Sequence, residues 1–278
     1  MTEFNRRQIL ATLLASGFAL AVRPVAASTV YTSAIGLKAC PDEVPTASGK
    51  LPVYLAGPEK ADKPLPVVIV VQEIFGVHEH IQDLCRRLAH AGYLAIAPEL
   101  FFRQGDPRQY EDIQQLIREL VGKVPDAQVM SDLDAVLAWS ASQGGDPQRA
   151  AITGFCWGGR ITWLYAAHNP QLRAGVAWYG RLGGEPTALT PTFPLDVAAR
   201  LKAPVLGLYA GRDKGISLES VEKMRSALGP DSRSKIIVYP DAEHGFNADY
   251  RPSFNATASA AAWQEMLKWF AAKGVAPR

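Results

Sequence analysis

The residues with the clearest capacity for chemistry form the pentapeptide Gly-Phe-Cys-Trp-Gly at residues 154–158. A short apolar segment, residues 149–153, precedes it, and residues 159–168 have the composition of a helix. This is the strand–turn–helix context of a nucleophile elbow, a sharp turn that exposes the nucleophile and leaves little room for side chains two residues away on either side. The sequence therefore predicts that Cys156 is a nucleophile, with a thiol where such turns more often carry a hydroxyl.

Two further loops carry the residue types that such a nucleophile needs. Asp213 follows an apolar segment at residues 205–209, and His244 follows another at residues 236–239. A histidine can take the proton of the thiol, and a carboxylate can hold the imidazole in the required tautomer. The chain order of nucleophile, acid and histidine is that of α/β-hydrolases. We predict a catalytic triad of Cys156, His244 and Asp213.

A carboxylate is expected beside this triad. Glu73 belongs to Gln-Glu-Ile-Phe-Gly at residues 72–76, which ends the apolar run of residues 66–72. The oxyanion-hole loop of such enzymes normally lies there. A free thiolate in an oxidising compartment would be converted to sulfenic acid and beyond, and a carboxylate hydrogen-bonded to the neutral thiol would protect it. We predict that Glu73 binds the resting thiol and releases it when substrate arrives.

These segments together resemble the dienelactone hydrolase family. The resemblance runs from about residue 46 to 273 and is carried by the motif at residues 72–76, by Gly-Phe-Cys-Trp-Gly-Gly at 154–159, by Asp213 and by His-Gly-Phe at 244–246. It implies a single-domain α/β-hydrolase fold and hydrolysis of a carboxylic ester or lactone, with no metal and no other cofactor. It also implies that the glutamate, cysteine, aspartate and histidine of these motifs are the catalytic residues.

The resemblance further implies which residues hold the substrate. The backbone N–H groups of Ile74 and Trp157 would form the oxyanion hole, and Arg103 would bind a substrate carboxylate. The family member that acts on dienelactone uses a second arginine four residues after the histidine, where this chain has Ala248. Arg251 lies three residues later, and whether it takes that place is left open.

The thiol restricts the substrates that we expect. A thiolate leaves a tetrahedral intermediate more readily than an alkoxide does, so esters with good leaving groups, such as enol-lactones, aryl esters and thioesters, are favoured. Tyr179 and Phe246 are predicted to line a small aromatic pocket for such a substrate, with core packing as the alternative. Two other functions stay open: hydrolysis of a different carboxylate-bearing ester or thioester, and a non-catalytic thiol or redox protein on the same scaffold.

The segments that must position these residues alternate between strand-like and helix-like patterns. Alternating β and α elements with right-handed crossovers predict one mostly parallel sheet with helices on both faces, in a domain from residue 46 to 278 that follows an extension at 28–45. Strands are predicted at 50–55, 66–72, 93–97, 149–153, 174–179, 205–209 and 236–239, and helices at 81–91, 113–121, 129–142, 159–168, 218–228 and 256–273.

Composition and charge narrow the class of partner. A chain of 278 residues with 48% hydrophobic residues can bury one large core. Of the 29 basic and 27 acidic residues, three arginines and one glutamate lie in residues 1–27, which leaves 26 of each sign in the remainder. A neutral body without a basic cluster argues against nucleic acid as a partner. We expect a monomer whose partner is a small ester or lactone, anionic if Arg103 binds it.

Residues 1–27 are typical of an export signal. Arg6 and Arg7 open a moderately apolar run that ends at Val22, and small residues follow as far as Ala27. The paired arginines resemble the twin-arginine class, and the alternatives are a general secretory signal and a retained anchor. The apolar run is short for a membrane span. We predict that the export machinery binds this signal and that the chain is cleaved after Ala27. The protein would then have no stable membrane anchor and a periplasmic location.

The number of cysteines is compatible with a periplasmic location if at least one thiol stays free. The three cysteines are Cys40, Cys85 and Cys156, and an odd number leaves at least one thiol free. Cys40 and Cys85 could form a disulfide, but cargo of the twin-arginine pathway folds before export and cannot depend on one. We therefore favour two separate thiols, with Cys85 buried on a helix.

Overall fold

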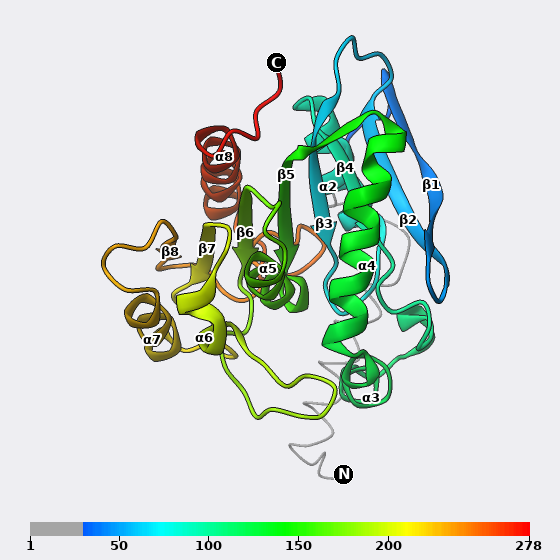
Figure 1. Cartoon of the computed structure of the whole chain (residues 1–278). Coiled ribbons are helices and arrows are strands. Elements are labelled where there is room, and N and C mark those ends of the chain that lie inside the picture. The colour runs from blue at the N-terminus through cyan, green and yellow to red at the C-terminus, as the bar shows by residue number, and fades with distance from the viewer. Residues whose placement is uncertain (1–29) are drawn as a thin grey trace, which may run out of the picture.

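The computed structural model describes residues 30–278 and has an eight-stranded sheet at its centre (Figure 1). The strand order is β1-β2-β4-β3-β5-β6-β7-β8, with β1, β2 and β4 joined by antiparallel pairings and the strands from β4 to β8 by parallel ones. The strands are β1 (Leu37–Thr46), β2 (Gly49–Pro58), β3 (Leu65–Val71), β4 (Leu94–Pro98), β5 (Gly145–Phe155), β6 (Ala174–Trp178), β7 (Val205–Ala210) and β8 (Lys235–Tyr239).

Helices cover both faces of this sheet. In Figure 1, α4 and α5 lie in front of the strands and α2 lies behind them, while α8 packs against β6 and β7. The helices are α2 (Glu79–His90), α3 (Ile113–Glu119), α4 (Asp126–Trp139), α5 (Trp157–His168), α6 (Pro194–Val197), α7 (Leu218–Leu228) and α8 (Ala256–Ala272). The predicted fold class, one α/β domain with a mostly parallel sheet, is confirmed.

The central strands form where β-branched side chains are buried on both faces. In β3 every residue from Pro66 to Val71 is buried, and β5 and β6 are buried around Ile152 and Val176. Full burial of one such side chain contributes about 1.5–3 kcal/mol. The carboxyl ends of these parallel strands therefore form one rigid edge, and Glu73, Cys156 and the loops after β7 and β8 are attached to it.

All the predicted strands and helices are present within a few residues of their expected bounds, whereas β1 and α6 were not predicted. β1 pairs with β2 along its whole length, so residues 37–45 of the predicted extension belong to the sheet. Only Val44 of its residues is buried, and Pro41 and Pro45 lie within it, as an edge strand permits. The predicted signal at residues 1–27 and its cleavage site lie outside the described residues.

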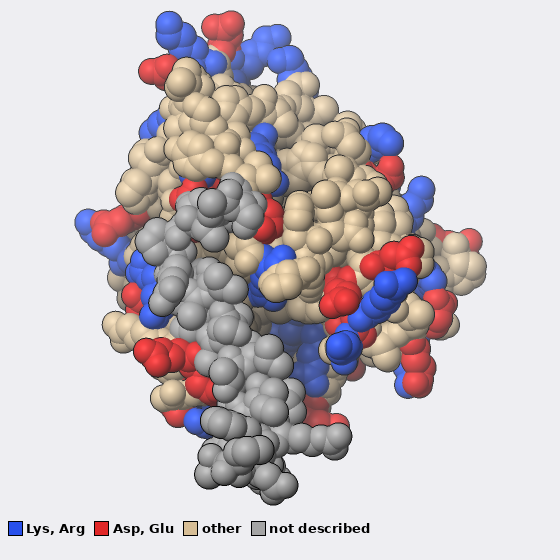
Figure 2. All heavy atoms as spheres, turned by 180° about the vertical axis from the view of Figure 1, so that it is seen from behind, with Lys and Arg blue, Asp and Glu red and all other residues tan. Residues whose placement is uncertain are grey.

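The surface carries both signs of charge. On the face that Figure 2 shows, acidic and basic side chains are interspersed around a largely uncharged surface, as the equal numbers of the two signs lead one to expect. Within residues 30–278 there is no helix with the length and apolar character needed to cross a bilayer.

Candidate active site

Cys156 stands on a strained turn between β5 and α5. Its backbone has φ 54° and ψ −110°, a conformation that is uncommon for a residue with a side chain and is typical of functional turns. A Cβ atom on Gly154 would overlap the carbonyl group of Gly158, and one on Gly158 would lie 2.5 Å from the carbonyl oxygen of Val71. Both glycines are therefore required by close backbone approach, and the turn has the geometry of the predicted elbow.

The loops after β7 and β8 bring Asp213 and His244 together. His244 Nδ1 lies 2.7 Å from Asp213 Oδ2. The other carboxylate oxygen of Asp213 accepts hydrogen bonds from the backbone N–H groups of Gly215 at 2.8 Å and Ile216 at 3.0 Å. The Asp213 side chain is 1% exposed and that of His244 is 32% exposed. The carboxylate is thus fixed from behind, while the imidazole reaches the solvent side.

His244 also interacts with the thiol of Cys156. Burial of the imidazole lowers its pKa, but the negative charge of Cys156 and the hydrogen bonds of the imidazole with Asp213 and Cys156 outweigh burial and raise the pKa of His244 to about 10. The imidazole therefore carries its proton at neutral pH when the sulfur beside it is ionised. The structure brings the three predicted triad residues, Cys156, His244 and Asp213, into one interacting group.

Glu73 lies fully buried directly after β3 and belongs to a second charged group. Its Oε2 accepts a short hydrogen bond from the Tyr250 hydroxyl, and lies 3.7 Å from Arg251 Nη2 and 3.8 Å from His78 Nε2. Burial alone raises the pKa of the Glu73 carboxyl, but the positive charge of Arg251 and the contact with His78 outweigh it and hold this pKa below its usual range. Glu73 is therefore a buried carboxylate that stays ionised.

The predicted hydrogen bond between Glu73 and the resting thiol is not formed. Among the described residues, Oε1 of Glu73 has no hydrogen-bond partner, Oε2 is bonded to Tyr250, and the thiol interacts with His244. The expectation of a thiol held by Glu73 is thus wrong for this arrangement. Tyr250 has no local signal in the sequence, because it lies 177 residues from Glu73 and reaches it only through the folding of a distant loop, whereas His78 belongs to the same loop after β3.

Cys156 and His244 share a pocket of about 450 Å³. Ile74, Trp157 and Tyr179 line it as well, so the two predicted oxyanion-hole residues and one predicted substrate residue lie around the thiol. Trp157 is the first residue of α5, so its N–H has no carbonyl one turn back and lies at the positive end of the helix dipole.

Phe246 has a different role from the predicted one. It is fully buried and is not among the residues that line the pocket of Cys156. Its ring meets that of Tyr179 edge-on, with 5.3 Å between the ring centroids, and it also packs against Trp178 and Tyr239. Phe246 therefore supports the pocket wall from behind, which is the core-packing alternative.

Arg103 does not lie at the pocket either. Its two terminal nitrogens form a bidentate ion pair with Asp132, at 2.6 and 2.9 Å, and one of them also donates to Thr46 at 3.0 Å. The guanidinium further stacks over the ring of Phe102. The predicted contact with a substrate carboxylate is thus wrong for Arg103, because its charge is already matched by Asp132, 29 residues along the chain in α4.

Neither Arg251 nor Ala248 lines the pocket. Ala248 is fully buried. The guanidinium of Arg251 pairs with Glu73 and lies 4.9 Å above the ring of Phe75, and the negative charge of Cys156 is among the causes that raise its pKa. Arg251 therefore acts on the site as a largely buried positive charge beside Glu73.

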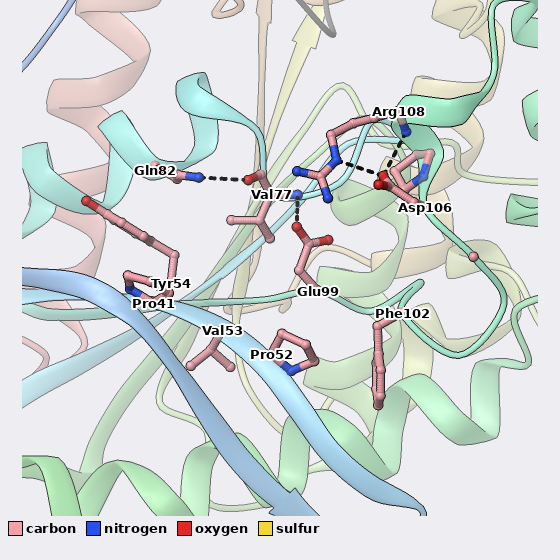
Figure 3. Close-up of a pocket in the computed structure, with 12 residues that line it drawn as sticks. Pro41, Pro52, Val53, Tyr54, Val77, Gln82, Glu99, Phe102, Asp106 and Arg108 are labelled. Carbon is pink, nitrogen blue, oxygen red and sulfur yellow. Dashed lines mark hydrogen bonds and ion pairs between the residues drawn. The ribbon is translucent and has the colours of Figure 1, made fainter. Parts of the chain in front are cut away.

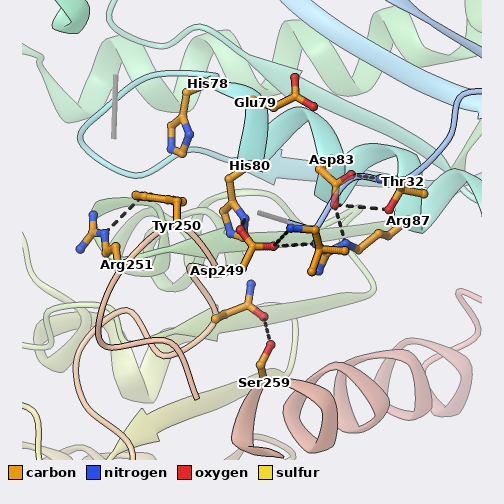
Figure 4. Close-up of polar contacts among 12 residues, drawn as sticks. Thr32, His78, Glu79, His80, Asp83, Arg87, Asp249, Tyr250, Arg251 and Ser259 are labelled. Carbon is orange, nitrogen blue, oxygen red and sulfur yellow. Dashed lines mark hydrogen bonds and ion pairs between the residues drawn. The ribbon is translucent and has the colours of Figure 1, made fainter. Parts of the chain in front are cut away.

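A chain of buried ion pairs extends from this loop to the start of the described chain (Figure 4). Asp249 accepts from His80 Nδ1 at 3.0 Å and from Arg87 at 2.9 Å. Arg87 also pairs with Asp83 at 2.6 Å, which in turn accepts from the N–H of Thr32 at 2.5 Å. The loop that supplies Tyr250 and Arg251 is thus tied to α2 and to the segment before β1.

Cys40 and Cys85 are both free thiols, and so is Cys156. Cys85 is fully buried on α2, where burial raises its pKa, and Cys40 lies on β1. The preferred prediction of two separate thiols is confirmed. Within residues 30–278, no group of three or more histidine, cysteine, aspartate or glutamate side chains is arranged to hold a metal ion.

A second cavity of about 490 Å³ lies away from the thiol (Figure 3). It is walled by β2 residues such as Tyr54 and by the loops after β3 and β4, and Glu99 accepts there from the N–H of Val77 at 3.1 Å. Its lining contains no nucleophile and no histidine. The smaller pocket around Cys156 is therefore the candidate active site.

The sequence and the fold are similar to those of known proteins. The model of the Dienelactone hydrolase family matches residues 51–274. A protein of Escherichia coli K12 named "Putative carboxymethylenebutenolidase" is 57% identical over 94% of this chain and 97% of its own length. A protein of the same name from Methylorubrum extorquens AM1 is 55% identical over 99% of this chain and 95% of its own length.

A solved structure extends this similarity to three dimensions. The crystal structure of a "Putative Dienelactone Hydrolase" from Klebsiella pneumoniae has 60% sequence identity to this chain and a TM-score of 0.83. The match covers 84% of this chain and 98% of that one.

Proposed function

The chain belongs to the dienelactone hydrolase family of carboxylic ester hydrolases, and on that basis we propose that it cleaves activated esters or lactones through a thioester on Cys156. The observation that carries the proposal is the 2.7 Å pair between His244 and Asp213, in which the imidazole also interacts with the thiol in one pocket. That set of groups supplies a nucleophile, a base and an orienting carboxylate.

The first half of the reaction is attack of the Cys156 sulfur on the acyl carbon. The imidazolium of His244 stabilises the thiolate, and Asp213 keeps Nδ1 protonated so that Nε2 serves the reaction. The carbonyl oxygen of the tetrahedral intermediate becomes an anion, and we expect the N–H groups of Ile74 and Trp157, two residues of the pocket lining, to bind it. When the intermediate collapses, the C–O bond breaks, and the departing oxygen takes its proton from His244.

The second half depends on a change in the charge around His244. Once the sulfur is part of a thioester, its negative charge is gone, and with it a main cause that raises the pKa of His244. The neutral imidazole then becomes a base for the water that attacks the thioester. A thiolate leaves a tetrahedral intermediate easily, so the first half goes forward only when the alcohol is a better leaving group than the sulfur. This favours enol, aryl and thiol leaving groups.

Glu73 acts in this scheme through its charge. It is an ionised carboxylate with one oxygen unpartnered, and both it and Cys156 act electrostatically on the hydroxyl of Tyr179. A second negative charge nearby disfavours a thiolate that lacks its imidazolium. We infer that Glu73 suppresses oxidation of the thiol when His244 is neutral, in place of the direct hydrogen bond that the sequence suggested.

We propose as well that the enzyme is exported and that it is a monomer. Residues 1–27 carry the paired arginines and apolar run of a twin-arginine signal, which supports a periplasmic enzyme. Fusing residues 1–27 to a reporter protein tests this. Secretion of the reporter should stop when Arg6 and Arg7 are both replaced by lysine. Secretion that is unaffected by this replacement would point to the general secretory route.

A chromogenic ester tests the function itself. The mature protein should release 4-nitrophenol from 4-nitrophenyl hexanoate, with an initial burst if the thioester accumulates. Cys156→Ala should remove both the burst and the steady-state rate. Hydrolysis that persists in this variant would exclude Cys156 as the nucleophile.

A further inference from the structure

The wall of the pocket around Cys156 is mostly apolar. Among the residues that the structure describes, no acidic side chain lines it. The apolar side chains of the lining are Ile74, Ile117, Val121, Trp157, Phe193 and Ile216. A ligand in this pocket therefore exchanges water for apolar surface over much of its area, which favours a ligand that is itself apolar.

The two arginines in the lining do not change this character. Both terminal nitrogens of Arg160 pair with the Asp126 carboxylate at 2.7 Å, and one of them also donates to the carbonyl of Thr192 at 2.6 Å. Arg181 is exposed, so water solvates its guanidinium and weakens its attraction for an anion. Neither arginine supplies a buried, unmatched charge, and an anionic group buried here lacks a partner that offsets its loss of water.

The arginines that the sequence analysis considered do not supply such a charge either. Arg103 is paired with Asp132 and does not line the pocket. Ala248 is uncharged, and Arg251 is paired with Glu73 and is also absent from the lining. The pocket is thus built for an uncharged group.

The outer part of the pocket lies between α3 and the segment that joins β6 to α6. That segment reaches the start of α4, where the N–H of Asp126 donates to the carbonyl of Leu189 at 2.9 Å (Figure 1). On this side the ring of Phe193 is 7% exposed and lies 4.8 Å from the guanidinium of Arg160. On the other side Ile117 projects from α3 and is 41% exposed. One wall is therefore packed, and the other presents apolar surface to water that a bound substrate can cover.

We propose that this pocket takes an uncharged, apolar acyl group and that Ile117 is a specificity-determining residue for it. The inference rests on the proposed esterase function and adds the substrate class, which is activated esters of uncharged, medium-chain acids. The acyl group is the part of the substrate that stays on Cys156 as the thioester after the alcohol has left. An apolar wall around the sulfur therefore contacts the acyl group in both halves of the reaction, whereas the leaving group is present only in the first.

A series of esters with one leaving group tests the substrate class. For 4-nitrophenyl acetate, butyrate and hexanoate, kcat/KM should rise by up to about fourfold for each CH₂ group that the pocket buries, and at least about tenfold from acetate to hexanoate. 4-Nitrophenyl hydrogen adipate has the same acyl length as the hexanoate but ends in a carboxylate. Its kcat/KM should be lower than that of the hexanoate, because the pocket offers the carboxylate no buried partner.

Variants at Ile117 test the role of this residue. Ile117→Ser should lower kcat/KM for the hexanoate about 3- to 10-fold and that for the acetate less than about twofold, because only the longer chain reaches the outer wall. Ile117→Leu keeps the apolar surface and should retain most of the preference for the hexanoate. Ile35→Ser is the matched control, since Ile35 is 85% exposed and lies before β1, outside the pocket lining. It should leave the rates on all the esters unaffected.

Three results would overturn the inference and leave the esterase function intact. They are a kcat/KM that does not rise with acyl length, a preference for the adipate ester over the hexanoate, and equal losses on acetate and hexanoate in Ile117→Ser. Failure of the unaltered protein to hydrolyse any of these esters would instead contradict the proposed function.

Discussion

Two charged centres flank Cys156, and they differ in their access to water. The pair of His244 and Asp213 opens to the pocket, with the imidazole 32% exposed. The group of Glu73, Tyr250 and Arg251 is sealed at its centre, because the Glu73 carboxylate has no exposed surface, while the Arg251 side chain at its edge is 21% exposed. The open pair can exchange protons with a substrate, whereas the sealed group holds fixed charges.

The difference explains why two carboxylates so close to one thiol can have separate roles. Asp213 is satisfied by two backbone N–H groups and one imidazole, so its charge serves to orient and stabilise His244. Glu73 is paired with the guanidinium of Arg251, so its charge serves the stability of the loop that carries Arg251 in addition to the effect on the thiol proposed above. Each prediction below removes one side of this comparison.

The largest effect is expected from Asp213→Asn. The amide keeps the shape of the carboxylate but can no longer hold His244 in the right tautomer or stabilise the imidazolium, so kcat should fall on the order of 10³- to 10⁴-fold. Asp241 provides the control, because it lies on the loop before His244, is exposed, and pairs only with Arg212. Asp241→Asn should change kcat less than about twofold, as substitutions at exposed pairs usually do. Initial rates on 4-nitrophenyl hexanoate measure kcat for both variants. Equal losses in Asp213→Asn and Asp241→Asn would show that Asp213 has no special role beside His244.

Substitutions in the group of Glu73, Tyr250 and Arg251 should lower the free energy of unfolding. Glu73→Gln leaves Arg251, whose side chain is 21% exposed, as an unpaired charge, which should lower the free energy of unfolding by at most about 3–5 kcal/mol. Arg251→Met leaves Glu73 unpaired and should cost a similar amount. The double variant should lose clearly less than the sum of the two, because neither charge is then left alone. Urea unfolding followed by tryptophan fluorescence measures this, and additive losses would show that the two groups do not form a functional pair.

The sequence predicts the parts of these centres that depend on neighbouring residues, and it does not predict contacts between residues far apart in the chain. The elbow glycines, the apolar β3 strand and the strand-end positions of Asp213 and His244 follow from local spacing, and these elements are where the sequence predicts them. The partners of the charged residues do not follow from spacing. Tyr250 and Glu73 are 177 residues apart, and no local pattern marks such a contact.

The same limit explains the error at Arg103 and the absence of β1 from the prediction. An arginine that follows a strand can bind either a substrate or a carboxylate on a neighbouring helix. Arg103 binds Asp132 because α4 packs beside it, and the sequence around Arg103 does not show this. β1 is an exposed edge strand with prolines, so it lacks the alternating apolar pattern that predicts strands.

A smaller effect is expected from Tyr250→Phe. The substitution keeps the ring, which packs 5.0 Å from that of His78, but removes the hydrogen bond to the ionised Glu73 carboxylate. Loss of one such bond should lower the free energy of unfolding by about 1.5–3 kcal/mol, less than the loss of Arg251. In contrast to Asp213→Asn, kcat on 4-nitrophenyl hexanoate should fall less than about tenfold. A loss of kcat as large as that of Asp213→Asn, with stability unchanged, would place Tyr250 in the chemistry of the open pair.

The smallest effect is expected from the pH dependence of the open pair, because water screens a partly exposed imidazole. The folded state raises the pKa of His244 from an ordinary value near 6.5 to about 10, so folding favours the protonated form. The stabilisation is therefore fully present below about pH 6.5 and is lost as the pH rises through about 10. His244→Gln has no such titration and serves as the reference, since groups that do not contact His244 and titrate near pH 10 affect both proteins alike. The melting temperature of the unaltered protein should exceed that of His244→Gln by the largest margin near pH 6, and the margin should shrink steadily toward pH 10.5. A margin that stays constant over this range would mean that His244 is not held as an imidazolium, and the open pair would then lack the charge that the thiolate requires.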